Sequence, residues 1–252
     1  NKLESAMEGF RRIDDSHRLS DAWYANSWLK HLANDYEGIK DSLLKASELA
    51  AAVGDRRREI ESLTYLSVLA HKHKQQEDKY HFLITAEEKM KAYGLPQFNF
   101  AKIPFHYAIF AENEADKVPH LKQVLAFTDL NPQHWVAQSS RRQLVEYYLK
   151  YDRVEDAKRL LSGLTNDNAQ NAYLRTIIAL AEGQNKRFIE LAQRTFEKAQ
   201  LAGLNRLSMD VALLLLQNAG NAVNTDFYIQ NIEQKAPLYW RLEHEDELTT
   251  WL

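Results

Sequence analysis

Apolar residues recur along most of the chain at helical offsets rather than in alternation. In the stretch from 141 to 161, the pair Leu144 and Val145 is followed three and four residues later by the pair Tyr148 and Leu149. The same spacing resumes after the polar residues 150–156. Runs of β-branched residues that alternate with polar ones, which are typical of strands, are missing. The pattern therefore predicts an all-α fold.

The periodic stretches are closed by residues that end helices. Such residues lie at Asp55, Pro96, Pro132, Asp167 and Asn205, which are 35 to 41 residues apart. Each interval contains one weaker polar break, at residues 34–38, 74–79, 112–119, 150–156 and 182–187. Two helices of about 12 to 18 residues fit between successive breaks. We therefore expect helical pairs over residues 20–205 and about 11 to 13 helices in all.

The two ends of the chain differ from this repeating middle. Residues 1–19 fit a leading helix, and Ser20 is expected to cap the start of the next one. Residues 206–252 are expected to form a terminal hairpin and a cap. The whole chain, 1–252, is interpreted as one helical-repeat domain.

Residues 141–164 resemble a tetratricopeptide repeat. The residues that carry the resemblance are Leu144, Val145, Tyr148, Ala157, Leu161 and Leu164. The chain departs from the family where Arg141 replaces the first-helix Trp and Asp152 replaces the turn Gly. In the first pair Trp23, Leu43 and Ala46 occupy corresponding positions, but Asn26 and Ser27 replace the family's Leu and Gly. The spacing also exceeds the family repeat of about 34 residues, so the array is a degenerate one.

The resemblance implies a right-handed α-solenoid of helical hairpins whose first helices line a concave surface. Such a surface suits an extended peptide or a partner helix. The resemblance also implies a protein–protein interaction domain that is not an enzyme, as in the sensory or assembly portion of a larger bacterial regulator. A protein or peptide partner, or a second copy in a homodimer, is expected. Two alternatives stay open, a domain that senses a small peptide or metabolite and an accessory domain of a helical-repeat enzyme.

The chain begins at Asn1 rather than Met, so we expect it to be the C-terminal part of a longer protein. It would then lie in the cytoplasm or form the extracytoplasmic part of a membrane-anchored regulator. Its longest purely aliphatic run is residues 211–216. A membrane span needs about 20 apolar residues, so none is expected.

Six polar residues on the expected first helices and their turns are the candidates for partner binding. They are Lys30, Asn34, Tyr107, Gln138, Arg141 and Arg142. Two adjacent arginines can hold a carboxylate or a phosphate. The alternative is an ordinary surface pair, with one arginine facing Glu146 one turn later.

Two aromatic groups have two interpretations each. Trp23, Tyr24 and Trp28 belong either to an interface or to the core. The set Tyr239, Trp240 and Trp251 belongs either to a cap over the last repeat or to an exposed apolar patch.

Composition excludes several classes of chemistry. Cysteine is absent, which removes disulfides, thiolate zinc sites and cysteine nucleophiles. The net charge is −3 with both signs interspersed, which argues against direct binding of nucleic acid. The pair His71 and His73 points to opposite sides of a helix, and the acidic residues 242–248 lack a calcium-loop pattern. No phosphate-binding or nucleophile motif occurs, so no cofactor, metal or catalytic residue is predicted.

Overall fold

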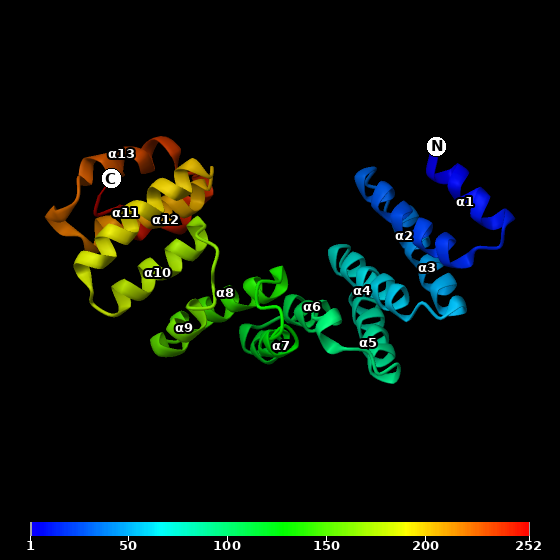
Figure 1. Ribbon diagram of the computed structural model, residues 1–252. Coiled ribbons are helices and arrows are strands. Elements are labelled where there is room, and N and C mark those ends of the chain that lie inside the picture. Colours follow the sequence, from blue (N-terminus) through cyan, green and yellow to red (C-terminus); the bar gives the residue numbers. More distant parts are fainter. Residues whose placement is uncertain (1, 252) are drawn as a thin grey trace. The chain divides into compact units, whose positions relative to one another are not determined.

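The computed structural model describes residues 2–251, and these fold almost entirely into α-helices, with no strand among them (Figure 1). The all-α prediction is therefore confirmed. The first half contains α1 (Lys2–Arg12), α2 (Ser16–Leu32), α3 (Tyr36–Val53), α4 (Arg56–Lys72), α5 (Gln76–Ala92), the 3-10 helix η1 (Gln97–Phe100), α6 (Lys102–Phe110) and α7 (Glu114–Phe127). The second half contains α8 (Trp135–Lys150), α9 (Val154–Leu161), α10 (Ala169–Ala181), α11 (Asn185–Leu201), α12 (Asn205–Asn218), η2 (Gly220–Ala222), α13 (Thr225–Lys235), α14 (Leu238–Glu243) and α15 (Glu245–Leu248).

The described residues contain 15 α-helices, more than the expected 11 to 13. The additional helices lie at the C-terminal end, where α14 has 6 residues and α15 has 4. A helix of one or two turns is too short to show an apolar period, so the sequence pattern could not separate these two.

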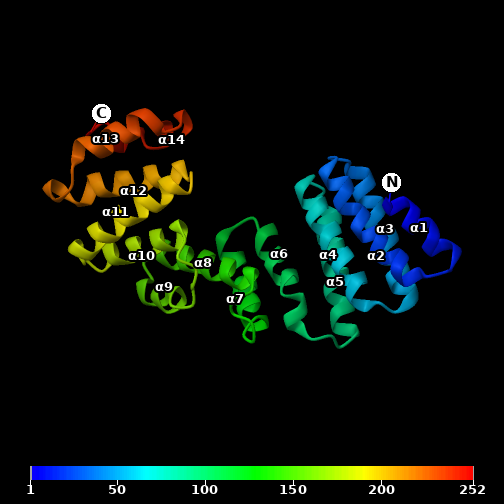
Figure 2. The same ribbon diagram turned by 45° about the horizontal axis from the view of Figure 1, so that its top comes forward.

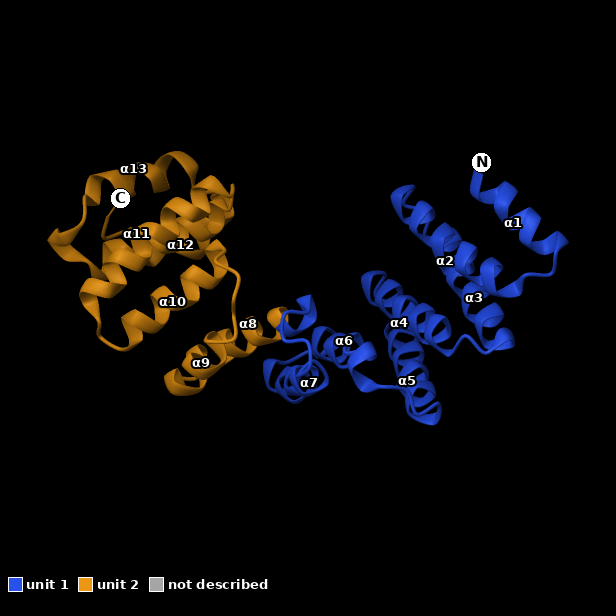
Figure 3. Cartoon of the chain, in the orientation of Figure 1, with its two compact units in different colours: residues 1–137 blue, residues 138–252 orange. Residues whose placement is uncertain are grey.

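The chain divides into two compact units, residues 1–137 and 138–252 (Figure 3). Within each unit, helices that are consecutive in sequence pack against one another, as α2 does with α3, α4 with α5, and α10 with α11. Figure 2 shows α10 to α13 following one another through the second unit. Nearest-neighbour packing is the arrangement that the repeat pattern predicted. The prediction of a single domain stays a prediction.

The turns inside the helical pairs fall where the polar breaks predicted them. Asn34, Lys74 and Asp152 each adopt a positive φ there, at 54°, 59° and 56°. This left-handed conformation reverses the chain directly after a helix and is normally occupied by glycine. Asn and Asp tolerate it better than most residues, which explains how Asp152 replaces a glycine at this position.

Aspartates cap the starts of three helices in the first unit. The side chains of Asp15, Asp35 and Asp55 accept backbone N–H groups of α2, α3 and α4 at distances of 2.9 to 3.0 Å. The expected cap at Ser20 is wrong, because α2 begins one turn earlier, after Asp15. Ser20 is instead fully buried, and its hydroxyl donates to the carbonyl oxygen of Ala46 at 2.8 Å.

The first unit contains two apolar clusters. One lies between α1 and α2, where Met7, Leu19 and Ala22 pack with Trp23. The other extends from α3 to α6 and is built on Leu43, Ile60 and Leu83 together with large aromatic residues. These positions repeat at three and four residues along each helix, as expected for the buried face of an amphipathic helix.

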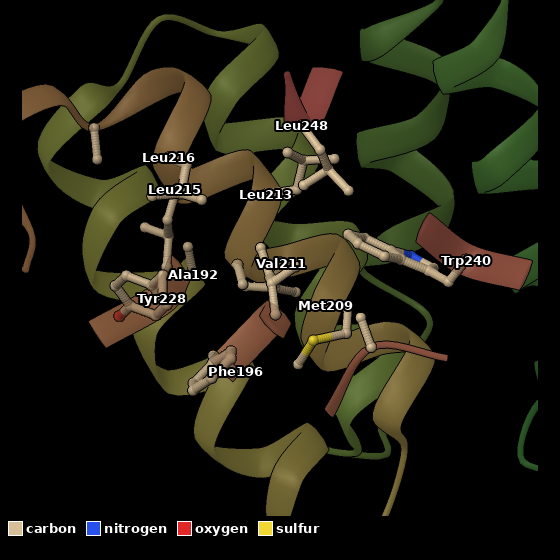
Figure 4. Close-up of a cluster of buried hydrophobic side chains, with 14 of the residues drawn as sticks. Ala192, Phe196, Met209, Val211, Leu213, Leu215, Leu216, Tyr228, Trp240 and Leu248 are labelled. Atoms are coloured by element: carbon tan, nitrogen blue, oxygen red, sulfur yellow. The ribbon is translucent and has the colours of Figure 1, made fainter. Parts of the chain in front are cut away.

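The second unit is organised around one apolar cluster that joins α10 to α15 (Figure 4). Trp240 of α14 is fully buried in it, and its indole N–H donates to Asp210 Oδ1 at 2.6 Å. Trp251 packs against the same cluster, whereas Tyr239 is 52% exposed. The C-terminal segment therefore caps the helices before it, and of the three aromatic residues only Tyr239 lies largely in solvent.

None of the helices between residues 2 and 251 combines the length and the apolar character needed to cross a membrane.

Candidate functional site

The first helices of the pairs in unit 1 contact one another directly, α2 with α4 and α4 with α6. Together with η1 and the residues at the start of α8, they surround a groove with a volume of about 340 Å³. All of its lining residues belong to unit 1. This volume lies at the lower end of the range for small-molecule sites, about 300 to 1,000 Å³.

Five of the fourteen residues that line the groove are Trp, Tyr or Phe. Trp28 on α2 stacks on Tyr65 of α4, with the ring centroids 5.2 Å apart. Trp135, at the start of α8, lies edge-on to Phe105 of α6 at 5.4 Å. The two tryptophans are 51% and 54% exposed. Large indole rings that remain half in solvent offer apolar contact area to another molecule.

The same helices show why Trp23 and Trp28 differ. Trp23 packs in the cluster between α1 and α2, and Lys45 Nζ lies 4.4 Å from its ring centroid. Five residues further on, Trp28 has turned to the groove side of α2. Of the two interpretations of this aromatic group, the core therefore applies to Trp23, and exposure on a groove applies to Trp28.

A compact network of charges lies at the α4 side of the groove. Glu61 accepts from Arg57 Nε at 2.9 Å and from an Arg58 guanidinium nitrogen at 3.0 Å. Arg58 also pairs with Asp21 of α2 at 2.7 Å. Two arginines and two carboxylates balance one another in this network, and the pairing with Glu61 raises the pKa of Arg57.

Two histidines line the opposite side of the groove. Burial, together with the positive charge of Lys102 one turn earlier on α6, lowers the pKa of His106 to about 4. Burial and Lys102 also lower the pKa of His134. Both rings are therefore neutral at pH 7. His134 Nδ1 already accepts from the Val136 N–H at 3.4 Å, so His134 has its Nε2–H left to donate, whereas His106 can offer a donor and an acceptor.

Two of the residues predicted for partner binding lie at the end of α2, and neither lines the groove. Lys30 Nζ pairs with Asp35 Oδ2 at 2.9 Å. Asn34 occupies the left-handed position of the following turn. Their contacts tie down the turn between α2 and α3, and a role in partner binding stays a prediction for both.

Tyr107 lies on α6 but outside this groove. Its ring stacks on His120 of α7 with the centroids 5.1 Å apart. Burial and the neighbouring carboxyl of Glu87 raise its pKa. Tyr107 therefore joins α6 to its neighbours α5 and α7, and its part in partner binding stays a prediction.

The other three predicted residues lie together in the first half of α8, in unit 2. Gln138 donates to the carbonyl oxygen of Gly163 at 3.0 Å. The Arg141 side chain lies so close to Gly163 that a Cβ there would be 2.7 Å from Arg141 Nε. Arg142 acts electrostatically on Glu146, as the surface-pair alternative expects. The first two thus hold the turn after α9.

Two features considered for metal binding are engaged within the fold. His71 stacks on Phe110 with the centroids 4.5 Å apart, and His73 lies against Tyr36. In the acidic segment, Glu243 pairs with Arg206 and His244 contacts Glu247. The segment folds into the end of α14 and α15. Between residues 2 and 251, no group of three or more His, Asp or Glu side chains is arranged to hold a metal ion.

Three residues of the groove, Tyr65, Lys102 and Trp135, were not among those predicted from the sequence. In the sequence, Tyr65 and Trp135 resemble the other apolar residues of their stretches. No neighbouring residue distinguishes Lys102 from the rest of the 32 lysines and arginines. A helical projection of Trp28 offered a signal, because this residue falls outside the buried stripe of α2. Their meeting depends on the packing of α2, α4 and α6.

No protein-family model matches the chain, and no curated protein matches it either.

Proposed function

We propose that this chain is a protein–protein interaction module whose aromatic groove in unit 1 binds an extended segment of a partner. The half-exposed pair Trp28 and Trp135 carries the proposal, because both rings line one groove on the first helices. Protein interfaces concentrate their binding energy in such aromatic residues.

The groove also offers polar groups suited to a peptide backbone. Asn99, Thr64 and the two neutral histidines lie among the aromatic rings. Amide, hydroxyl and imidazole groups can pair with the N–H and C=O groups of an extended chain without requiring a charge. An extended peptide that lies across several helices would use the rings for apolar contacts and these groups for register.

Nearest-neighbour helix packing supports a degenerate tetratricopeptide-like array as the scaffold. In this proposal the array is a right-handed solenoid and forms the signal-receiving or assembly part of a larger regulatory protein. We do not propose the groove as a catalytic centre, since Glu61, the carboxylate among its lining residues, is engaged with Arg57 and Arg58.

A displayed library of random ten-residue peptides provides a direct test. Selection on the intact chain should enrich peptides whose affinity falls at least about tenfold for Trp28→Ala or Trp135→Ala, as expected for interface hot spots. Phe98→Ala is the matched control, because Phe98 is 50% exposed in the same unit but does not line the groove.

Two results would contradict the proposal. One is the failure of repeated selection to enrich any peptide over an unrelated helical protein. The other is a set of enriched peptides that bind both tryptophan variants as tightly as the original chain. Circular dichroism of each variant would confirm that its helices are intact.

A further inference from the structure

The charges that line the groove in unit 1 are not all neutralised within the fold. Arg57 and Glu61 line the groove and pair with each other at 2.9 Å, and Glu61 also pairs with Arg58, which lies outside the lining. Lys102, at the start of α6, lines the same groove and is exposed. No carboxylate within residues 2–251 lies at ion-pair distance from its ammonium group. One unpaired positive charge therefore remains inside an otherwise balanced groove.

The residues around Lys102 do not compensate its positive charge. The positive charge of Lys102 acts on both His106 and His134, which line the groove with it. Both rings are neutral at pH 7, so they neither cancel the charge nor add to it. A group that brings a negative charge to this end of the groove would relieve an electrostatic imbalance that the fold itself leaves.

The aromatic rings of the groove indicate which kind of side chain should accompany the negative charge in a bound segment. The Trp28–Tyr65 stack and Trp135 present indole and phenol surface next to the groove floor made by Phe100 and Ile103. Phe100 is 5% and Ile103 is 1% exposed, so the floor is already packed and only a side chain entering from outside can use the open rings.

We infer that the groove selects a partner segment in which an aromatic or large apolar side chain is followed or preceded, within a few residues, by an aspartate or a glutamate. The apolar side chain packs against the Trp28–Tyr65 stack and Trp135, and the carboxylate pairs with Lys102. This inference rests on the proposed function, because it names the chemistry of the segment that the groove would bind.

A peptide fits these observations better than a nucleic acid does. Polyanions are held by many lysines and arginines at once, each neutralising a phosphate. Of the two lysine and arginine residues that line this groove, Arg57 is already paired with Glu61, and Lys102 remains. One carboxylate side chain is enough to neutralise this single cation.

The test compares selections from the random ten-residue library on three proteins. On the unaltered chain, the enriched peptides should combine an aromatic residue with Asp or Glu. On Lys102→Glu, the enrichment should shift to Lys or Arg beside the aromatic residue. Lys122→Glu is the matched control, because Lys122 is an exposed lysine on α7 that does not line the groove and its replacement makes the same change in net charge.

Individual peptides sharpen the comparison. Replacing the acidic residue of an enriched peptide by its amide should weaken binding to the unaltered chain about fivefold, the upper range for an exposed ion pair. The same replacement should have no effect on Lys102→Gln. In NMR titrations, the acidic peptide should raise the pKa of His106 and His134, since its carboxylate offsets Lys102, and the amide peptide should not.

The possible outcomes separate the two proposals. Peptides that need Trp28 and Trp135 but show no acidic preference would overturn the inference about Lys102 and leave the interaction function standing. A preference that survives Lys102→Glu would overturn it as well, because another cation would then be responsible. Failure to enrich any peptide would contradict the function itself.

Discussion

Three tryptophans of this chain, Trp23, Trp28 and Trp240, lie in three different environments. Trp23 packs between α1 and α2 beneath Lys45. Trp28 lies half exposed on Tyr65, and Trp240 is completely enclosed with its N–H on Asp210. The environment decides what the loss of the ring should affect. Loss of a ring packed in a cluster should lower stability, and loss of a ring exposed on the groove should weaken binding.

Replacing Trp240 should destabilise the second unit. Trp240→Ala removes the largest fully buried side chain of that unit and leaves the carboxylate of Asp210 without its donor. We expect a loss of about 3 to 5 kcal/mol in the free energy of unfolding. Urea denaturation followed by circular dichroism measures it. Tyr239→Ala, at the neighbouring exposed position, should change it by less than about 0.5 kcal/mol.

His106 should make the first unit sensitive to acid. Its pKa is about 4 in the folded chain and about 6.5 when unfolded, so the unfolded chain binds more protons between these values. The contribution of His106 to the free energy of unfolding should be fully present above about pH 6.5. It should decrease as the pH falls to 4 and change little below that, with a total loss of up to about 3 kcal/mol. The depressed pKa values of His71 and His134 act in the same direction.

The measurement is the free energy of unfolding as a function of pH for the unaltered chain and for His106→Phe. The variant should show a clearly smaller decrease between pH 6.5 and 4, whatever its stability at pH 7. Equal slopes for the two proteins would contradict the assignment of this acid sensitivity to His106.

The helices of this chain are defined largely by signals at their ends. Asp15, Asp35 and Asp55 cap the N-termini of successive helices, and left-handed residues close the preceding ones. These signals are local in sequence, so the polar breaks predicted the turns correctly. Ser20 illustrates the limit, because a serine followed by an apolar stretch resembles a cap although its hydroxyl is buried on Ala46.

Asn34 should contribute mainly to the turn between α2 and α3. Its φ of 54° is strained for alanine and unstrained for glycine. Asn34→Ala should therefore lower the free energy of unfolding by about 1 kcal/mol, and Asn34→Gly should leave it nearly unchanged. Thermal unfolding of both variants gives the comparison. A loss of peptide binding in Asn34→Gly at unchanged stability would instead support the predicted role of Asn34 in partner binding.

At the scale of the whole molecule, the apolar residues gather in separate clusters within two compact units. Chains built from neighbour-to-neighbour contacts distribute their stability in this way, because each element depends on the adjacent ones. A substitution that removes packing in one cluster should therefore destabilise mainly the helices around that cluster.

Hydrogen exchange tests this directly. Leu43→Ala empties a fully buried position in the first unit, at a cost of about 2 to 5 kcal/mol. We expect faster amide exchange in α2 to α5 and little change in α10 to α13. Trp240→Ala should produce the reverse pattern. Equal acceleration across all of these helices would show that the chain unfolds as one cooperative domain.

The sequence by itself determined the helical class, the pairing of helices and the places where the chain turns, because periodicity, caps and breakers act over a few residues. It also singled out Arg141 and Gln138, and the side chains of both lie against the turn at Gly163. Only the tertiary structure decided which aromatic rings remain open and which cation stays unpaired. Trp28, Lys102 and Trp135 are far apart in sequence, and they share one groove because α2, α4 and α6 pack side by side.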